Sequence, residues 1–171
     1  MAKKLITTVI LSIGLIVFAG CAGNKPAAEQ SRNAADIKGD AIKLADGADS
    51  YFNTHDLTNT KADDLAAQAR IYSDGFKKLT SETESLQKKT NYDPSLDGIL
   101  EFVRNAGNSL SNFAGALGQN PMQNHEGFLA MRSALNTWEL FSDKLNAMRA
   151  SKNSNYGWWK KPVWAKDPFY N

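Results

Sequence analysis

The sequence predicts an all-α protein, an up-down-up-down four-helix bundle, and three observations lead to this expectation. Apolar residues recur at alternating spacings of three and four, the spacing of one helix face, over four long stretches. Short connections separate these stretches, which places neighbouring helices antiparallel. No stretch alternates between apolar and polar residues as a half-buried strand does. With 42% hydrophobic and 22% charged residues among 171, the composition is that of one ordinary globular domain.

The first two helices are expected over residues 26–54 and 60–89. Pro26 suits the first turn of a helix, and the apolar stripe that follows it is rich in alanine. Thr60 and Asp63 have the spacing of a capping box at the start of the second helix. Thr83 interrupts the apolar stripe of this helix.

The third helix is expected to open at Asp93-Pro94, a cap followed by a first-turn proline, and to stop at Gly118. The fourth is expected to start between Pro121 and Glu126 and to end near Ala150. One face of the fourth helix carries Phe128, Met131, Leu135, Trp138, Phe141, Leu145 and Met148. Such a stripe, together with Phe113 of the third helix, is typical of a packed core, with the wall of a cofactor cavity as the alternative.

Residues 151–171 form a C-terminal tail in which Pro162 and Pro168 prevent a long helix. Because the fourth helix returns toward the start of the first, we expect the tail at that end of the bundle. The tail could pack on the bundle, contact lipid head groups, or dock to an envelope protein or a cell-wall glycan. Its aromatic and basic side chains form a candidate interaction surface of Trp158, Trp159, Lys160, Lys161, Trp164, Lys166, Phe169 and Tyr170.

The N-terminus has the three parts of an export signal over residues 1–20. Lys3 and Lys4 give a basic start, an apolar run from Leu5 follows, and small residues lie directly before Cys21. The run from Leu5 to Ala19 has fifteen residues, fewer than the roughly 20 that a bilayer-spanning helix needs. An ordinary cleaved signal or an uncleaved anchor remain the alternatives to lipid attachment.

The segment Phe18-Ala19-Gly20-Cys21 resembles the lipobox of bacterial lipoproteins, although Phe18 replaces the usual leucine. The resemblance covers residues 1–21 and implies that the leader is removed and that Cys21 carries a diacylglycerol. It also implies that the new amine is often acylated, with chains such as palmitate. Residues 21–25 would then be the lipidated cysteine and a linker. The resemblance associates an aspartate in the next position with the inner membrane, so Ala22 favours the outer membrane in a bacterium that has two.

Charge and cysteine content exclude several classes of function. From residue 21 onward, 18 basic residues balance 18 acidic ones, whereas a nucleic-acid-binding protein would show a basic field. A single cysteine excludes an internal disulfide or a multi-cysteine zinc site. No phosphate-binding loop, calcium loop or nucleophile elbow occurs, so we expect no enzyme activity and no cofactor.

The two histidines are expected at the end of the bundle distant from the anchor. His55 follows the first helix and His125 opens the fourth, with Asp56 and Glu126 beside them. Two histidines and two carboxylates could complete a divalent metal site, but their spacing matches no metal-binding motif.

The lipobox resemblance and the four apolar stripes together lead us to expect a membrane-anchored cell-envelope lipoprotein with a non-catalytic structural or interaction domain. A periplasmic bundle that binds a small ligand or metal is the alternative.

Overall fold

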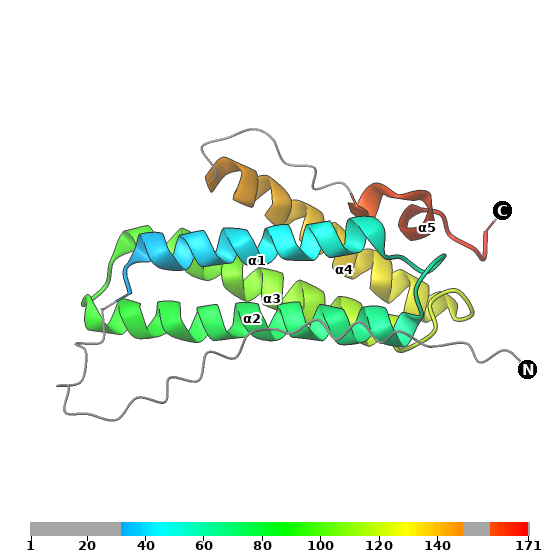
Figure 1. The fold of residues 1–171 in the computed structure, drawn as a ribbon, viewed down its shortest axis with the longest axis horizontal. Helices are drawn as coiled ribbons and strands as arrows, with labels where there is room; N and C mark the ends of the chain where they lie inside the picture. The colour runs from blue at the N-terminus through cyan, green and yellow to red at the C-terminus, as the bar shows by residue number, and fades with distance from the viewer. Residues whose placement is uncertain (1–31, 149–157, 171) are drawn as a thin grey trace, which may run out of the picture. The chain divides into compact units, whose positions relative to one another are not determined.

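The computed structural model describes residues 32–148 and 158–170, and four long helices dominate them (Figure 1). They are α1 (Ala34–Thr54), α2 (Ala62–Lys89), α3 (Asp97–Leu117) and α4 (His125–Met148). Short helical turns complete the described chain: η1 (Pro94–Leu96), η2 (Trp158–Lys160) and α5 (Pro162–Ala165). The described residues contain no strand, so the all-α expectation is confirmed. The leader, Cys21 and the linker to residue 25 lie outside the described residues.

The start of α1 is fixed by a capping box. Asn33 has an extended backbone, its side chain accepts a hydrogen bond from the backbone N–H of Asp36, and the Asp36 carboxylate accepts one from the N–H of Asn33. The helix therefore begins at Ala34 rather than at Pro26, and residues 26–31 lie outside the described part of the chain.

The expected cap of α2 was wrong, because Lys61 occupies that position without a side-chain hydrogen bond. The hydroxyl of Thr60 donates to Asn59 instead. At the next helix the expectation holds: the Asp93 side chain caps the N–H of Ser95, and Pro94 lies in the first turn of η1. Gly118 ends α3 as expected, with a right-handed backbone.

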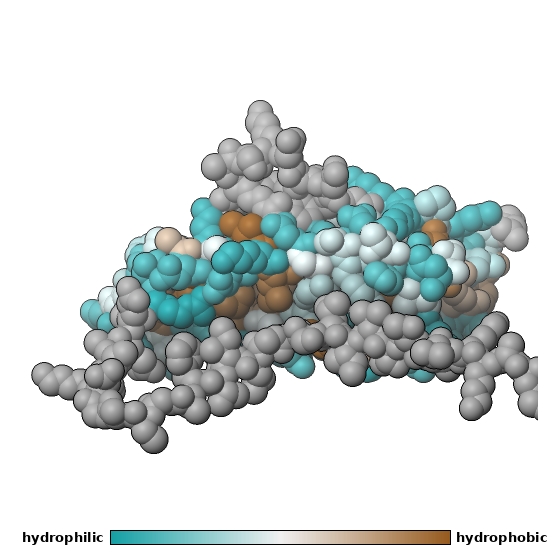
Figure 2. Space-filling view, in the orientation of Figure 1, coloured by the Kyte–Doolittle hydropathy of each residue, from teal (hydrophilic) through white to brown (hydrophobic). Residues whose placement is uncertain are grey.

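The core lies between the helices and is rich in aromatic rings. Ring pairs such as Phe76 with Phe102 and Phe52 with Phe113 meet edge to face, at 5.9 and 5.4 Å between centroids. Alanines of α1 and α2 are buried in the same core cluster, so the core combines small side chains with large ones. On the face shown in Figure 2, most of the coloured residues are hydrophilic, and apolar residues show on both sides of α1, toward α4 and toward α2.

Three hydroxyl groups are buried in this core, and each donates a hydrogen bond to a backbone carbonyl. Ser73 of α2 donates to the carbonyl of Gly107 in α3, and Ser109 of α3 donates to the carbonyl of Ala134 in α4. The hydroxyl of Thr83, which interrupted the apolar pattern, is fully buried and donates to a carbonyl of its own helix at 2.6 Å. Burial of these groups therefore does not carry the cost of a lost hydrogen bond.

Candidate functional site

The C-terminal segment, defined here as residues 158–170, packs onto a surface formed by α1, α3 and α4. Trp158 is 1% exposed. Its ring stacks on Phe52 of α1 at 4.8 Å and lies 5.6 Å from Phe113 of α3 and 6.3 Å from Trp138 of α4. Trp158 therefore joins three helices through one side chain. The turn η2, which precedes α5 in Figure 1, contacts both α1 and α4.

A second tryptophan extends this contact along the segment. Trp164 is fully buried, and its ring meets Phe113 edge to face at 5.5 Å. The guanidinium of Arg132 in α4 donates to the carbonyl of Ala165 and so holds the end of α5. Trp159 is 8% exposed and meets Trp158 edge to face.

A buried carboxyl group lies beneath Trp158. Asp49 of α1 is 4% exposed, and its Oδ1 accepts hydrogen bonds from the indole N–H of Trp158 at 2.6 Å and of Trp138 at 3.2 Å. Its Oδ2 is buried and has no hydrogen-bond partner. Burial raises the pKa of the Asp49 carboxyl to about 8; the two indole hydrogen bonds lower it in part, and the charge of Asp46 raises it.

The structure corrects the expected interaction surface. Trp158, Trp159 and Trp164 belong to the core and are not available on the surface. Lys161 is half-buried at the end of α1. Its amine donates to the carbonyl of Asn53 and lies 3.7 Å from the Asp56 carboxylate. The exposed members that remain are Lys160, Lys166, Phe169 and Tyr170. Of these, Lys160 lies 3.4 Å from the Glu139 carboxylate.

The position of the segment also differs from the expectation. The tail was expected where α1 begins, but Lys161 contacts the last turn of α1, and Asp167 lies 3.4 Å from the imidazole of His125 at the start of α4. Residues 149–157, which connect α4 to this segment, lie outside the described residues. Apolar periodicity predicts where helices lie along the sequence but not where a segment without a long helix docks. It therefore could not place Lys161 and Asp167 beside the end of α1 and the start of α4.

The candidate metal ligands do not form one cluster. His55 stacks on Tyr51 at 4.2 Å, and its Nδ1 lies 3.0 Å from the Tyr51 carbonyl. His125 packs against Phe169 and Tyr170 instead. Asp56 accepts hydrogen bonds from Thr58, and its pKa is lowered because these bonds and Lys161 outweigh the opposing effect of burial. Glu126 is exposed. Within the described residues no three histidine, cysteine or acidic side chains are placed to hold a metal ion.

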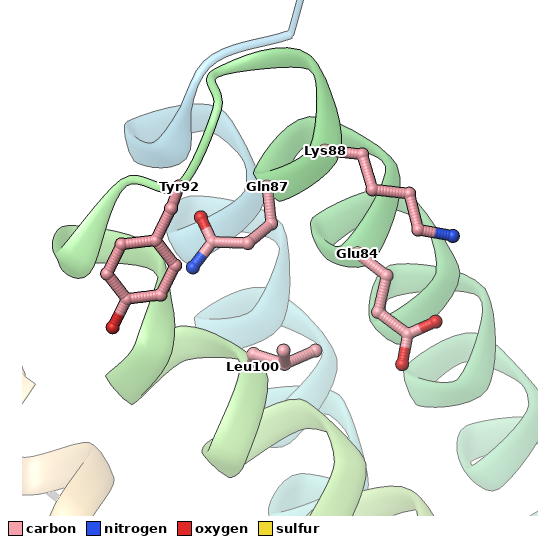
Figure 3. Close-up of a pocket in the computed structure, with 5 residues that line it drawn as sticks. All are labelled: Glu84, Gln87, Lys88, Tyr92 and Leu100. Carbon is pink, nitrogen blue, oxygen red and sulfur yellow. The ribbon is translucent and has the colours of Figure 1, made fainter.

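A separate surface pocket of about 340 Å³ lies beside the connection between α2 and α3 (Figure 3). Its lining comprises Glu84, Gln87, Lys88, Tyr92 and Leu100. Tyr92 is 62% exposed and has a left-handed backbone, with φ of 72°, and its hydroxyl donates to Asp97. Gln87 fixes this turn, because its side-chain oxygen accepts from the N–H of Asp93 and its amide donates to Asp97.

Sequence reasoning missed Asp49, although the periodicity of α1 contains a signal for it. Asp49 lies four residues after Ala45 and three before Phe52, and both of these residues are fully buried. A carboxyl group at that spacing lies on the buried face of the helix. The donors that accompany it come from residues 89 and 109 positions away in the sequence, so its partners could not be found from local patterns.

Comparison with known proteins adds no relative: no family model matches this chain, and no curated protein or solved structure shows significant similarity to it. Among the helices of residues 32–148 and 158–170, none has the length and apolar character needed to cross a membrane.

Proposed function

We propose that this chain is a cell-envelope lipoprotein, anchored to a membrane through lipid on Cys21, whose helical domain is a non-catalytic interaction module. The observation that carries the proposal is the segment Phe18-Ala19-Gly20-Cys21 after a basic start and an apolar run. Several acyl chains hold a protein on a membrane durably, since each buried CH₂ contributes about 0.8 kcal/mol. Ala22 favours the outer membrane where a cell has two.

The same proposal includes an up-down-up-down order of the four helices. Interhelical contacts support it: Ser73 of α2 bonds to Gly107 of α3, while Glu84, later in α2, pairs with Arg104, earlier in α3. Residue numbers thus rise along one helix as they fall along its neighbour, which is the sign of antiparallel packing. Contacts between α3 and α4 follow the same rule, with Ser109 bonded to Ala134 and Glu101 paired with Lys144.

A short tether would keep the helical domain close to the lipid. Arg32, the first described residue, follows Cys21 by eleven positions, a span of at most about 40 Å for an extended chain. The Arg32 guanidinium pairs with Asp40 of α1 and Glu82 of α2, so the domain is held from its first residue. The start of α1 would therefore remain within about 40 Å of the lipid.

The exposed end of the C-terminal segment is the part of the expected interaction surface that could still meet an envelope protein or a cell-wall glycan. Tyr170 is 71% exposed and Phe169 is 39% exposed, while Lys166 is exposed beside them. Exposed aromatic rings next to a basic group are common in surfaces that bind partners. We expect Tyr170→Ala with Lys166→Ala to weaken capture of such a partner without loss of folding.

Metabolic labelling tests the proposed anchor directly. The full chain is expressed in a bacterium with two membranes that is fed an alkyne-bearing fatty acid, and the purified protein is examined for label. We expect label on the wild-type chain and none on Cys21→Ala. Ala22→Asp is the matched control: it should retain the label while moving from outer-membrane to inner-membrane fractions. A well-expressed wild-type chain without label would overturn the proposal.

A further inference from the structure

Asp49 connects three parts of the molecule through a single oxygen atom. The carboxyl belongs to α1, and the two indole groups that donate to its Oδ1 come from α4 and from the C-terminal segment. A carboxylate in water is ionised at neutral pH, but here the side chain is 4% exposed and Oδ2 has no hydrogen-bond partner. An ionised Asp49 would therefore be a buried charge with one oxygen left without compensation.

We propose that docking of the C-terminal segment is controlled by a proton: Asp49 is neutral while residues 158–170 are docked, and its ionisation releases them. The segment is a proton-sensitive cover over the surface formed by α1, α3 and α4.

Geometry indicates why the segment, rather than a long helix, moves when Asp49 ionises. Water must reach the carboxyl to solvate its charge, and Trp158 covers it from η2, a turn of three residues. Trp138, the other donor, is 3% exposed and lies within the 24-residue helix α4, which packs along α3, so moving it away would displace a long helix. Displacing Trp158 is therefore the smaller rearrangement that hydrates Asp49.

Thermodynamic linkage gives the direction and the size of the effect. Burial raises the pKa of Asp49 to about 8 in the docked form, while the carboxyl returns to an ordinary pKa near 3.8 when solvent reaches it. The docked form thus binds the proton more tightly. Docking is strongest below about pH 4 and weakens as the pH rises to about 8, by up to tenfold per pH unit and roughly 10⁴-fold in total.

Other charged groups face the segment and must be separated from this effect. Asp46 belongs to α1, and His55 and Asp56 follow its end; from α4 the groups are His125, Arg132 and Glu139; within the segment they are Lys160, Lys161, Lys166 and Asp167. Asp56 has a lowered pKa, because its hydrogen bonds with Thr58 and the charge of Lys161 outweigh burial, so it stays ionised while Asp49 titrates. His125 lies 3.4 Å from the Asp167 carboxylate, which makes Asp167→Asn a necessary control.

Indole N–H signals in nuclear magnetic resonance spectra report docking at each tryptophan. The full chain is purified in a mild detergent, labelled with ¹⁵N and titrated from pH 5 to pH 9. We expect the signals of Trp158 and Trp164 to move to the positions of exposed indoles as the pH rises, while helix content by circular dichroism stays constant. Asp49→Asn keeps an acceptor for Trp158 but cannot ionise, so its Trp158 signal should remain at the docked position at pH 9.

Asp167→Asn removes a carboxylate from the same segment and should retain the transition of the wild type. The proposal is overturned if the wild-type Trp158 signal stays at its docked position at pH 9, or if Asp49→Asn shows the same transition. Loss of helix together with the Trp158 signal would also overturn it, since whole-domain unfolding is then the event. Should Asp49→Asn fail to fold, the wild-type titration and Asp167→Asn still decide between these outcomes.

Discussion

Replacement of Trp158 by alanine should strongly destabilise the helical domain. The indole is 1% exposed and fills the space between Phe52, Phe113 and Trp138, so its loss leaves a cavity bounded by three helices. Truncation of a buried tryptophan costs about 3–5 kcal/mol in unfolding free energy. Asp49 also loses its shorter hydrogen bond, at 2.6 Å. For a domain of this size, we expect the melting temperature to fall by roughly 10–15 °C.

Thermal and urea unfolding followed by circular dichroism at pH 5.5 measures this loss under conditions where Asp49 is neutral. Tyr170→Ala is the matched control, because Tyr170 is an aromatic residue of the same segment but is 71% exposed, and we expect a change below about 0.5 kcal/mol. Trp158→Phe keeps a ring but removes the indole N–H and should give an intermediate loss. A Trp158→Ala chain as stable as the wild type would refute the assignment of this residue to the core.

Glycine and capping substitutions test the helix packing by the same unfolding measurements. Gly115→Ala should raise the free energy of unfolding by about 0.5–1 kcal/mol, because a Cβ there meets nothing within 4 Å. Gly107→Ala should not give this stabilisation, because its Cβ would lie 3.2 Å from the Cβ of Phe76. Equal effects of the two substitutions would contradict the described contact between α2 and α3. Asn33→Ala should lower the free energy of unfolding by about 1 kcal/mol, because the capping hydrogen bond to Asp36 is lost. Thr60→Ala should change it little, because Thr60 does not cap α2. A larger loss for Thr60→Ala than for Asn33→Ala would contradict these cap assignments.

Helix positions could be predicted from the sequence wherever an apolar stripe and a clear terminus coincide. Asp93 and Pro94 marked a helix start correctly, because the carboxylate side chain and the proline ring both suit the first turn. Thr60 did not, because its hydroxyl bonds to Asn59 within the connecting turn and is not available as a cap. A cap depends on which local hydrogen bond is formed, and the sequence offers more than one choice.

The candidate site was predicted less well than the helices, for a physical reason. Three tryptophans within seven residues indicated that the tail contacts something, and packing on the bundle was one of the three interpretations. The surface that Trp158 covers is assembled from Phe52, Phe113 and Trp138, which lie on three different helices. Such a surface exists only after folding. The apolar stripe of α1 was identified from its hydrophobic residues alone. A carboxyl group on the same face, such as that of the buried Asp49, is not counted in such a stripe.

The mass of the mature chain tests the proposed anchor most directly. The protein is extracted with detergent from the envelope of the cells that produce it naturally, and its intact mass and N-terminal peptide are measured. We predict a chain that starts at Cys21 and carries the added mass of a diacylglycerol, with or without a third acyl chain on the amine. A chain that still begins at Met1, or a mature chain with an unmodified thiol on Cys21, would contradict the account.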